Sequence, residues 1–445
     1  MKPEVALIYP YFRTFADIQQ LFQPLGIACL GAEIKNLGIP VIQYDCTFEK
    51  YDDVIDSVLA QNPSIVGIYT MITLSRNTFK MLTSLREKLP HSLFVSGGPL
   101  PTLYPDRFAK EFDIVFRGES DISFPMFCKD YLENPSKERI LKTMPLYKYP
   151  GIYIFDNGKK VDVIPKHLSQ REVRELQIAD RSFGRHKEYQ EFWKLKTGES
   201  PATIMMTKGC PFNCDFCSKP IFGNKLRKRS IPDCINEILY IKSLGYSQLW
   251  IADDCFTLDD RFLNNFCLEM MKKKVNMTWS CLSRVDNMRD ESAELMRDAG
   301  CVKIYLGVES GSNRTLSLMK KHVKVKDVSI IVKRMNKANI KIGAFFIVGY
   351  PGETINSIKK TFKFSLSLPF DEISFTVPYP LPGSNLYNKI KGLNSNDDWD
   401  FENENRFIFK SQFDESWLKN EIKIVLSEFE KRKISSTLHP QISRR

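Results

Sequence analysis

Short apolar runs alternate with amphipathic stretches through the first third of the chain. The apolar runs stand at residues 5–9, 41–44, 65–69, 93–96 and 114–117. The segments between them, such as 51–61 and 75–88, repeat their apolar residues at helical spacing. Strands this short and this apolar are buried on both faces, and helical connections between them make the strands parallel. The pattern predicts an α/β fold that opens with a doubly wound, Rossmann-like parallel sheet over residues 1–133.

A second series of strand–helix units follows. Its expected strands cover residues 203–206, 248–251, 277–281, 303–306, 341–347 and 372–377. Helical spacing predicts the connections between them, among which are residues 232–244 and 325–338. Six such units predict a partial (βα)6 barrel over residues 201–390. The chemistry of such barrels lies at the carboxyl ends of the strands.

Two segments are less regular. Residues 134–200 are predicted to be a linker segment, in which Asn157 and Gly158 between two apolar stretches indicate a β-hairpin. Residues 391–445 form a short α-helical C-terminal region that begins acidic at 396–400. The apolar residues of its expected helix are Trp417, Ile422, Ile424, Val425 and Phe429. This region could cap the barrel or form part of the substrate site.

The composition is that of a globular protein with a basic balance. The chain has 445 residues, of which 43% are hydrophobic and 26% charged, and a net charge of +11. No apolar run reaches the roughly 18–20 residues of a membrane span, and no signal-peptide core is visible, so we expect a cytoplasmic protein. The basic stretch at residues 225–229 favours an anionic or protein partner. The other lysines and arginines are dispersed, which argues against nucleic acid.

Eleven cysteines are present, and only three of them lie close together in the sequence. Without an export signal, the thiols are expected to be reduced. Scattered cysteines within apolar patterns are usually small core residues. The scattered ones here are Cys29, Cys46, Cys128, Cys234, Cys255, Cys267, Cys281 and Cys301.

The three clustered cysteines, Cys210, Cys214 and Cys217, follow an apolar run with the spacing CxxxCxxC. Three thiolates this close can bind three irons of a [4Fe–4S] cube and leave the fourth iron open for chemistry. The alternatives are three ordinary core cysteines or part of a zinc site. Zinc sites of this kind use paired CxxC halves or histidines, and no histidine lies between His186 and His322. The cluster is therefore the favoured interpretation.

This spacing after a strand resembles the signature of the radical S-adenosylmethionine (SAM) enzymes. Residues 24–31 and the paired glycines within 97–102 resemble the cobalamin-binding domain that precedes the radical SAM core in class B of that family. The chain is thus similar to the cobalamin-dependent radical SAM enzymes, among which C-methyltransferases fit it best. The resemblance runs from residue 5 to about residue 390.

The resemblance implies three cofactors. These are a [4Fe–4S] cluster on Cys210, Cys214 and Cys217, SAM on the open iron, and cobalamin on the N-terminal sheet. The implied SAM contacts lie at successive strand ends and are Phe216, Asp254, Ser283, Arg284, Glu309, Ser310 and Gly349. Asp254 would accept a hydrogen bond from the SAM amino group, and Arg284 would pair with the SAM carboxylate. The implied cobalamin contacts are Thr70, Thr73, Gly97, Gly98, Pro99, Gly118 and Glu119. No side chain is expected to be catalytic in itself.

One motif of many cobalamin proteins is absent. The motif Asp-x-His-x-x-Gly after the second strand supplies a histidine below the cobalt, but residues 45–50 contain neither His nor Gly. Leu100 also stands where many relatives have a histidine. Either cobalamin binds without a protein imidazole or the domain has lost it. Because the glycine loops remain, we favour retained cobalamin.

The reaction that the resemblance implies is methyl transfer from methylcobalamin to an unactivated sp3 carbon by way of a 5′-deoxyadenosyl radical (EC 2.1.1). The substrate would be a protein side chain, such as the glutamine of methyl-coenzyme M reductase, or a small molecule. A ferredoxin- or flavodoxin-type protein would donate electrons, and we expect a monomer in an anaerobic cell. One alternative is an enzyme that rearranges or cyclises its substrate without methylating it. Another is a cobalamin-sensing binding protein with a structural cluster.

Overall fold

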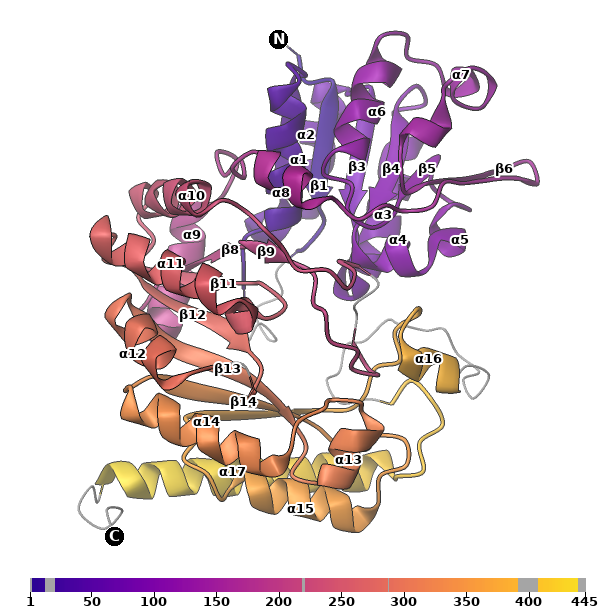
Figure 1. Ribbon diagram of the computed structural model, residues 1–445. Coiled ribbons are helices and arrows are strands. Elements are labelled where there is room, and N and C mark those ends of the chain that lie inside the picture. The colour runs from indigo at the N-terminus through magenta and orange to yellow at the C-terminus, as the bar shows by residue number, and fades with distance from the viewer. Residues whose placement is uncertain (1, 13–20, 218–220, 287, 391–406, 439–445) are drawn as a thin grey trace. The chain divides into compact units, whose positions relative to one another are not determined.

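The chain forms two compact units (Figure 1). A computed structural model describes residues 2–12, 21–217, 221–286, 288–390 and 407–438. The first unit contains residues 1–204 and 219–247, and the second contains 205–218 and 248–445. The segment 134–200 thus groups with the N-terminal sheet. The loop with the three clustered cysteines lies in the second unit.

The first unit is built on a seven-stranded sheet with the order β2-β1-β3-β4-β5-β6-β7. Its parallel strands are β1 (Val5–Tyr9), β2 (Val41–Asp45), β3 (Ile65–Tyr69), β4 (Leu93–Gly97) and β5 (Ile114–Phe116). The antiparallel edge consists of β6 (Ile152–Asp156) and β7 (Lys159–Asp162). Asn157 and Gly158 between them both have positive φ, as the predicted hairpin turn requires. The doubly wound parallel sheet is confirmed.

Helices cover both faces of this sheet because consecutive strand residues point in opposite directions. Leu7 belongs to a core with α1 (Leu25–Asn36) and α6 (Ser123–Leu132). Its neighbour Ile8 belongs to a second core with α2 (Tyr51–Gln61) and α3 (Ser75–Arg86). The other elements of this unit are η1 (Cys46–Phe48), η2 (Ile72–Leu74), α4 (Pro99–Leu103), α5 (Pro105–Phe108), α7 (Lys137–Lys142), η3 (Leu146–Lys148), α8 (Gln170–Glu175), α9 (His186–Thr197), β8 (Pro201–Ile204), β10 (Arg227–Lys228) and α10 (Ile231–Ser243).

The second unit contains five parallel strands in the order β15-β14-β13-β12-β11. They are β11 (Gln248–Ile251), β12 (Thr278–Ser283), β13 (Cys301–Glu309), β14 (Lys341–Ile347) and β15 (Glu372–Thr376). The helices that follow them in turn are α11 (Asp260–Lys272), α12 (Asp290–Asp298), α14 (Val325–Lys337) and α15 (Ile355–Ser365). The short elements are β9 (Thr207–Lys208), η4 (Phe256–Leu258), α13 (Asn313–Leu318) and α16 (Asn385–Ile390). The series of strand–helix units is as predicted, and β8, its first strand, falls into the first unit.

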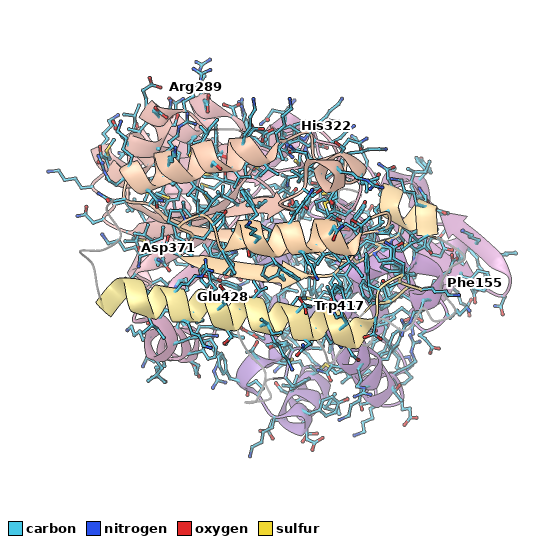
Figure 2. The ribbon with its side chains drawn as sticks, turned by 90° about the horizontal axis from the view of Figure 1, so that it is seen from below. Phe155, Arg289, His322, Asp371, Trp417 and Glu428 are labelled. Atoms are coloured by element: carbon cyan, nitrogen blue, oxygen red, sulfur yellow. The ribbon has the colours of Figure 1, made fainter. Side chains whose placement is uncertain are left out.

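The C-terminal helix α17 (Glu415–Leu438) is an outer helix of the second unit. Its buried residues are Leu418, Ile422, Val425 and Phe429, whereas Ile424 is 53% exposed. Arg432 and Lys433 donate to the carbonyl oxygens of Leu366 and Asp371, both at 3.0 Å, so the helix runs beside the connection from α15 to β15 (Figure 2). The acidic stretch expected at 396–400 lies outside the described residues. No helix among those the structure describes is long and apolar enough to span a membrane.

Candidate active site

The three clustered cysteines lie on a loop that follows β9 in the second unit. All three thiols are partly exposed, and the Cys217 N–H donates to the Cys214 carbonyl oxygen at 3.3 Å. Within the described ranges no three His, Cys, Asp or Glu side chains are gathered as they would be around a single metal ion. A cube binds each thiolate to a different iron, so its cysteines stand farther apart than the ligands of one ion. The donor set fits a [4Fe–4S] cluster with one iron left open.

Arg284, directly after β12, is turned toward this loop. Its Nη1 lies 3.6 Å from the Cys214 Sγ, and its guanidinium carbon lies 3.6 Å from the centre of the Phe212 ring. The Nε and Nη2 atoms donate to both carboxylate oxygens of Asp286 at 2.9 and 3.0 Å, and Nη2 also donates to the Lys321 carbonyl oxygen at 2.8 Å. Arg284 was expected to pair with the SAM carboxylate. In the structure most of its donors are engaged by the protein.

Glu309, at the end of β13, forms a buried ion pair. Its Oε1 lies 2.7 Å from the Lys321 Nζ, and both side chains are less than 10% exposed. Burial opposes the charge of Lys321, but the nearby Glu309 carboxylate and Cys214 raise the pKa of the ammonium. The same ammonium lies 5.9 Å from the centre of the Phe216 ring. Lys321 thus connects two expected SAM contacts, Glu309 at the end of β13 and Phe216 on the cluster loop.

The two aspartates after β11, Asp253 and Asp254, have different environments. Asp253 is fully buried and accepts from the Met206 N–H at 2.7 Å, and burial raises its pKa to about 7. Asp254 is exposed. Burial, and then the Asp254 carboxylate, raise the pKa of the Cys210 thiol, which places Asp254 near the cluster loop. Asp254 is therefore the solvent-exposed member of the pair.

Three other expected SAM contacts serve the fold. The Ser283 hydroxyl is buried and bonds to the Thr257 hydroxyl at 2.7 Å. The Ser310 hydroxyl bonds to that of Thr361 on α15 at 2.9 Å. Gly349 has a φ of +81°, and a Cβ there would lie 2.6 Å from the Phe407 ring. Any contact of these residues with SAM would come through the backbone or a shared hydroxyl.

Asp215, between two of the cysteines, is a residue that sequence reasoning missed. Its side chain is fully buried and accepts from the Tyr350 hydroxyl at 2.9 Å. Lys389 on α16 and Lys320 form ion pairs with it, the latter at 3.5 Å. Its backbone N–H donates to the Met319 carbonyl oxygen, and its carbonyl oxygen accepts from the Leu386 N–H. Segments that follow β13, β14 and β15 thus all hold the cluster loop through this residue.

Glu353 in turn holds Tyr350. Its Oε2 accepts from the N–H groups of Gly349 and Tyr350 at 2.9 and 3.0 Å. Burial raises the pKa of Glu353 to about 7. For the Gly349-to-Glu353 turn the sequence predicts only a SAM contact, at Gly349. The hydrogen bonds that connect this turn to the cysteine loop, through Tyr350 and Asp215, depend on the fold.

In the first unit, the loops expected to contact cobalamin are joined by backbone hydrogen bonds. The order of the strands reverses between β1 and β3, where ligands of such sheets bind. The Thr70 N–H after β3 donates to the Gly97 carbonyl oxygen at 2.8 Å, and the Leu100 N–H donates to the Thr70 carbonyl oxygen at 3.2 Å. Gly98 has a φ of +109°, and a Cβ there would lie 2.7 Å from the Thr70 oxygen. Only glycine fits this position.

The other loops at the carboxyl edge of this sheet contact the loops after β3 and β4. The Thr102 hydroxyl donates to the Gly98 carbonyl oxygen at 2.8 Å and accepts from the Gly118 N–H at 2.9 Å. Pro99 opens α4, and Thr73 is an exposed residue of η2. Tyr9 and Tyr69, whose rings are 5.7 Å apart, close the ends of β1 and β3. Both tyrosines end predicted strands, but nothing in the sequence pattern indicates that they form a pair.

Glu119, an expected cobalamin contact, has a structural role in the first unit. Its carboxylate is buried, accepts from the Leu168 N–H at 2.7 Å and forms an ion pair with buried Arg227. Arg229 pairs with Glu237, which also lies 2.8 Å from Arg181. The basic stretch 225–229 is therefore not an open basic surface, because two of its arginines are internal counter-ions.

Asp45 occupies the position from which the absent cobalamin motif would begin. It is buried and accepts from the Thr47 N–H at 3.1 Å and from the Tyr189 hydroxyl at 2.8 Å. His91, the only histidine within residues 1–133, precedes β4 and so lies at the amino edge of the sheet. No imidazole of this segment, where described, stands at the carboxyl edge. Any cobalamin on this sheet would bind without a histidine from residues 1–133.

Comparison with known protein families supports the domain types expected for the two units. Residues 204–365 match the Radical SAM superfamily, and residues 14–127 match the B12 binding domain. The chain therefore combines the two domains of the cobalamin-dependent radical SAM enzymes. The cofactors of this family are a [4Fe–4S] cluster, SAM and cobalamin, as expected from the sequence.

Relatives of this radical SAM protein include methyltransferases and cyclases. An uncharacterized methyltransferase of Pyrococcus horikoshii is 29% identical over 82% of this chain and 77% of its own length. The cytidylyl-2-hydroxyethylphosphonate methyltransferase of Streptomyces wedmorensis is 24% identical over 86% of this chain and 80% of its own length. The anaerobic magnesium-protoporphyrin IX monomethyl ester cyclase of Rubrivivax gelatinosus is 24% identical over 87% and 70%.

A solved structure has the same fold. The radical SAM methyltransferase TsrM from Kitasatospora setae, with cobalamin and a [4Fe–4S] cluster bound, superposes with a TM-score of 0.74 at 16% identity. The match covers 88% of this chain and 75% of that one. The predicted architecture is confirmed by this match.

Proposed function

We propose that this radical SAM protein transfers a methyl group from methylcobalamin to an unactivated sp3 carbon. The observation that carries the proposal is the presence, in one chain, of a three-cysteine loop at the strand ends of the second unit and a B12-binding sheet in the first. The three cofactors would supply an abstracting radical and a methyl group. Several relatives are named methyltransferases, which supports transfer of the methyl group over its retention.

The residues of the chain would bind and orient these groups. Cys210, Cys214 and Cys217 would hold the cluster, and the exposed carboxylate of Asp254 would accept a hydrogen bond from the SAM amino group. Phe216 would pack against SAM from the cluster loop. The glycine-rich edge of the first sheet would hold cobalamin through its backbone, since Gly97 and Gly98 leave no side chain in the way. Exclusion of water by the cluster loop and the strand ends of the second unit would protect the radical.

We propose that the substrate is neutral or carries both positive and negative charges, and that it is not a polyanion. The basic stretch 225–229, which first favoured an anionic partner, has two of its arginines buried in ion pairs. A protein side chain, such as the glutamine of methyl-coenzyme M reductase, stays one option and a small molecule another. The second candidate function is cyclisation without methyl transfer, which relatives named as cyclases favour.

Anaerobic reconstitution with iron, sulfide and cobalamin tests the proposal. The protein would receive SAM with a deuterated methyl group and a one-electron reductant, and both 5′-deoxyadenosine and S-adenosylhomocysteine would be quantified. A methyltransferase gives both products, and labelled methyl appears on the substrate. A cyclase gives 5′-deoxyadenosine without S-adenosylhomocysteine. A cobalamin sensor gives neither.

The matched control removes the cluster alone. Cys210→Ala, Cys214→Ala or Cys217→Ala should abolish 5′-deoxyadenosine formation, because three ligands are needed for the cube. Retained cobalamin, measured by absorbance after gel filtration, should be unchanged. Loss of cobalamin in these variants would contradict the assignment of the two cofactors to separate units.

A further inference from the structure

We propose that Arg284 sets the reduction potential of the cluster through its hydrogen bond to Cys214, rather than binding the carboxylate of SAM. The inference rests on the cluster that the family implies and does not depend on which reaction the enzyme performs. Arg284 would act on the cluster indirectly, through the sulfur of its ligand Cys214.

The donors of the guanidinium are nearly all in use. An arginine has five N–H donors. Four of them point at partners within the second unit: two at Asp286, one at the Lys321 carbonyl oxygen and one at the Cys214 sulfur. A carboxylate clamp needs two parallel donors. Arg284 could offer one such pair to SAM only by giving up bonds that it already makes.

The orientation of the Arg284 guanidinium is also fixed by packing. It stacks on Phe212 of the cluster loop, with the guanidinium carbon 3.6 Å from the ring centre, and its side chain is only 6% exposed. The Lys321 backbone that it contacts is fixed by the buried pair with Glu309. A donor fixed this firmly points at the same sulfur before and after an electron arrives.

A hydrogen bond to a cluster sulfur favours the reduced state. Reduction adds negative charge, part of which resides on the cysteine sulfurs, and a charged donor stabilises that added charge. In a buried site the effect is larger than in water. Asp286 acts in the opposite direction, since its carboxylate lies on the far side of the same guanidinium and partly cancels its charge. The two residues should therefore shift the potential with opposite signs.

The test is a redox titration of the reconstituted full-length protein without SAM, followed by electron paramagnetic resonance of the reduced cluster. In Arg284→Gln the equilibrium constant for reduction should fall about tenfold, which is a shift of about 59 mV to more negative potential. In Asp286→Asn the shift should be smaller and positive. Arg284→Lys, which keeps the charge but loses the fork, should lie between Arg284→Gln and the natural protein. Arg289→Gln, an arginine paired with Asp260 at 3.2 Å and 77% exposed, is the matched control and should give no shift.

Iron content and SAM affinity complete the design. Unchanged potentials in variants with full iron content would overturn the proposal, as would shifts of the same sign in Arg284→Gln and Asp286→Asn. A weaker affinity of Arg284→Gln for SAM at an unchanged potential would restore the carboxylate role instead. Should Arg284→Gln fail to take up iron, the opposite signs expected for Arg284→Lys and Asp286→Asn still decide the question.

Discussion

Both units place loops at the carboxyl edge of a parallel sheet, but they hold these loops in different ways. In the first unit, the loops after β3 and β4 are joined by backbone hydrogen bonds at Thr70 and by the steric fit of Gly98. In the second unit, buried charged side chains hold the cluster loop, among them Asp215 and the Glu309–Lys321 pair. The loops of the first edge are held by backbone hydrogen bonds and steric fit, and those of the second by buried charges.

This difference suits the groups that each edge would bind. Cobalamin is large, and a backbone edge without side chains can approach it closely. The cluster and SAM carry charges that change during the reaction, so fixed ion pairs and oriented donors can stabilise them. Substitutions in the first edge should therefore act through strain. Those in the second should act through electrostatics.

The largest effect is expected at the exception to this rule. Glu119 and Arg227 form a fully buried ion pair in the first unit. Arg227→Leu leaves the carboxylate buried without its partner and should lower the free energy of unfolding by about 3–5 kcal/mol. The double variant with Glu119→Gln should recover part of that loss in chemical denaturation. Equal losses in the single and double variants would mean that the pair is not coupled.

Gly98→Ala tests the backbone-held edge. The new methyl carbon would lie 2.7 Å from the Thr70 oxygen at a φ of +109°, so we expect a loss of about 3 kcal/mol and weaker retention of cobalamin. Gly158→Ala is the matched control, because it has a φ of +76° but no atom within 4 Å. Its cost should be the backbone strain alone. An equal effect of both substitutions would show that the close approach to Thr70 does not matter.

Asp215→Asn tests the charge-held edge. The amide can still accept from the Tyr350 hydroxyl but no longer pairs with Lys389 and Lys320, both of which can reach water. We expect a stability loss of about 1–2 kcal/mol and a lower iron content after reconstitution. Asp260→Asn, whose carboxylate is partly exposed beside Arg289, is the control. Full iron content in Asp215→Asn would mean that the charge is not needed to hold the loop.

The fold was predictable because its signals are local. The apolar runs that became β1 and β3 have the predicted bounds, Val5–Tyr9 and Ile65–Tyr69, and α2 is also as predicted. Each depends only on the spacing of neighbouring residues. The C-terminal helix was predicted as well, but its buried face includes Leu418 and excludes Ile424, because the rest of the second unit decides which side is covered.

The partners within the site were not predictable, because they are distant in the sequence. Arg284 and Cys214 are 70 residues apart, and Tyr350 and Asp215 are 135 residues apart. A sequence shows that a charged residue follows a strand, but not which neighbour it meets. Glu119 illustrates the point, since its partner Arg227 lies 108 residues later, in the basic stretch that was predicted to favour an anionic or protein partner.

The smallest effect concerns Glu353, which accepts from the N–H of Tyr350, the residue whose hydroxyl donates to Asp215 of the cluster loop. Burial raises its pKa from 4.5 to about 7, so the folded protein binds this proton more tightly than the unfolded chain. The stabilisation by the neutral form is complete below about pH 4.5 and is lost as the pH rises through about 7. Glu353→Gln mimics the neutral form and should remove this dependence.

Thermal and chemical unfolding of both proteins from about pH 5 to pH 8 would measure the difference. Between about pH 6 and pH 8 the natural protein should lose about 1 kcal/mol relative to Glu353→Gln. The amide oxygen can still accept from the Gly349 and Tyr350 N–H groups, so iron content should not fall. A difference that grows toward acidic pH would mean that Glu353 is charged when folded. In that case the turn that supports the cluster loop would also be held by charge, like Asp215, and not by a buried neutral acid.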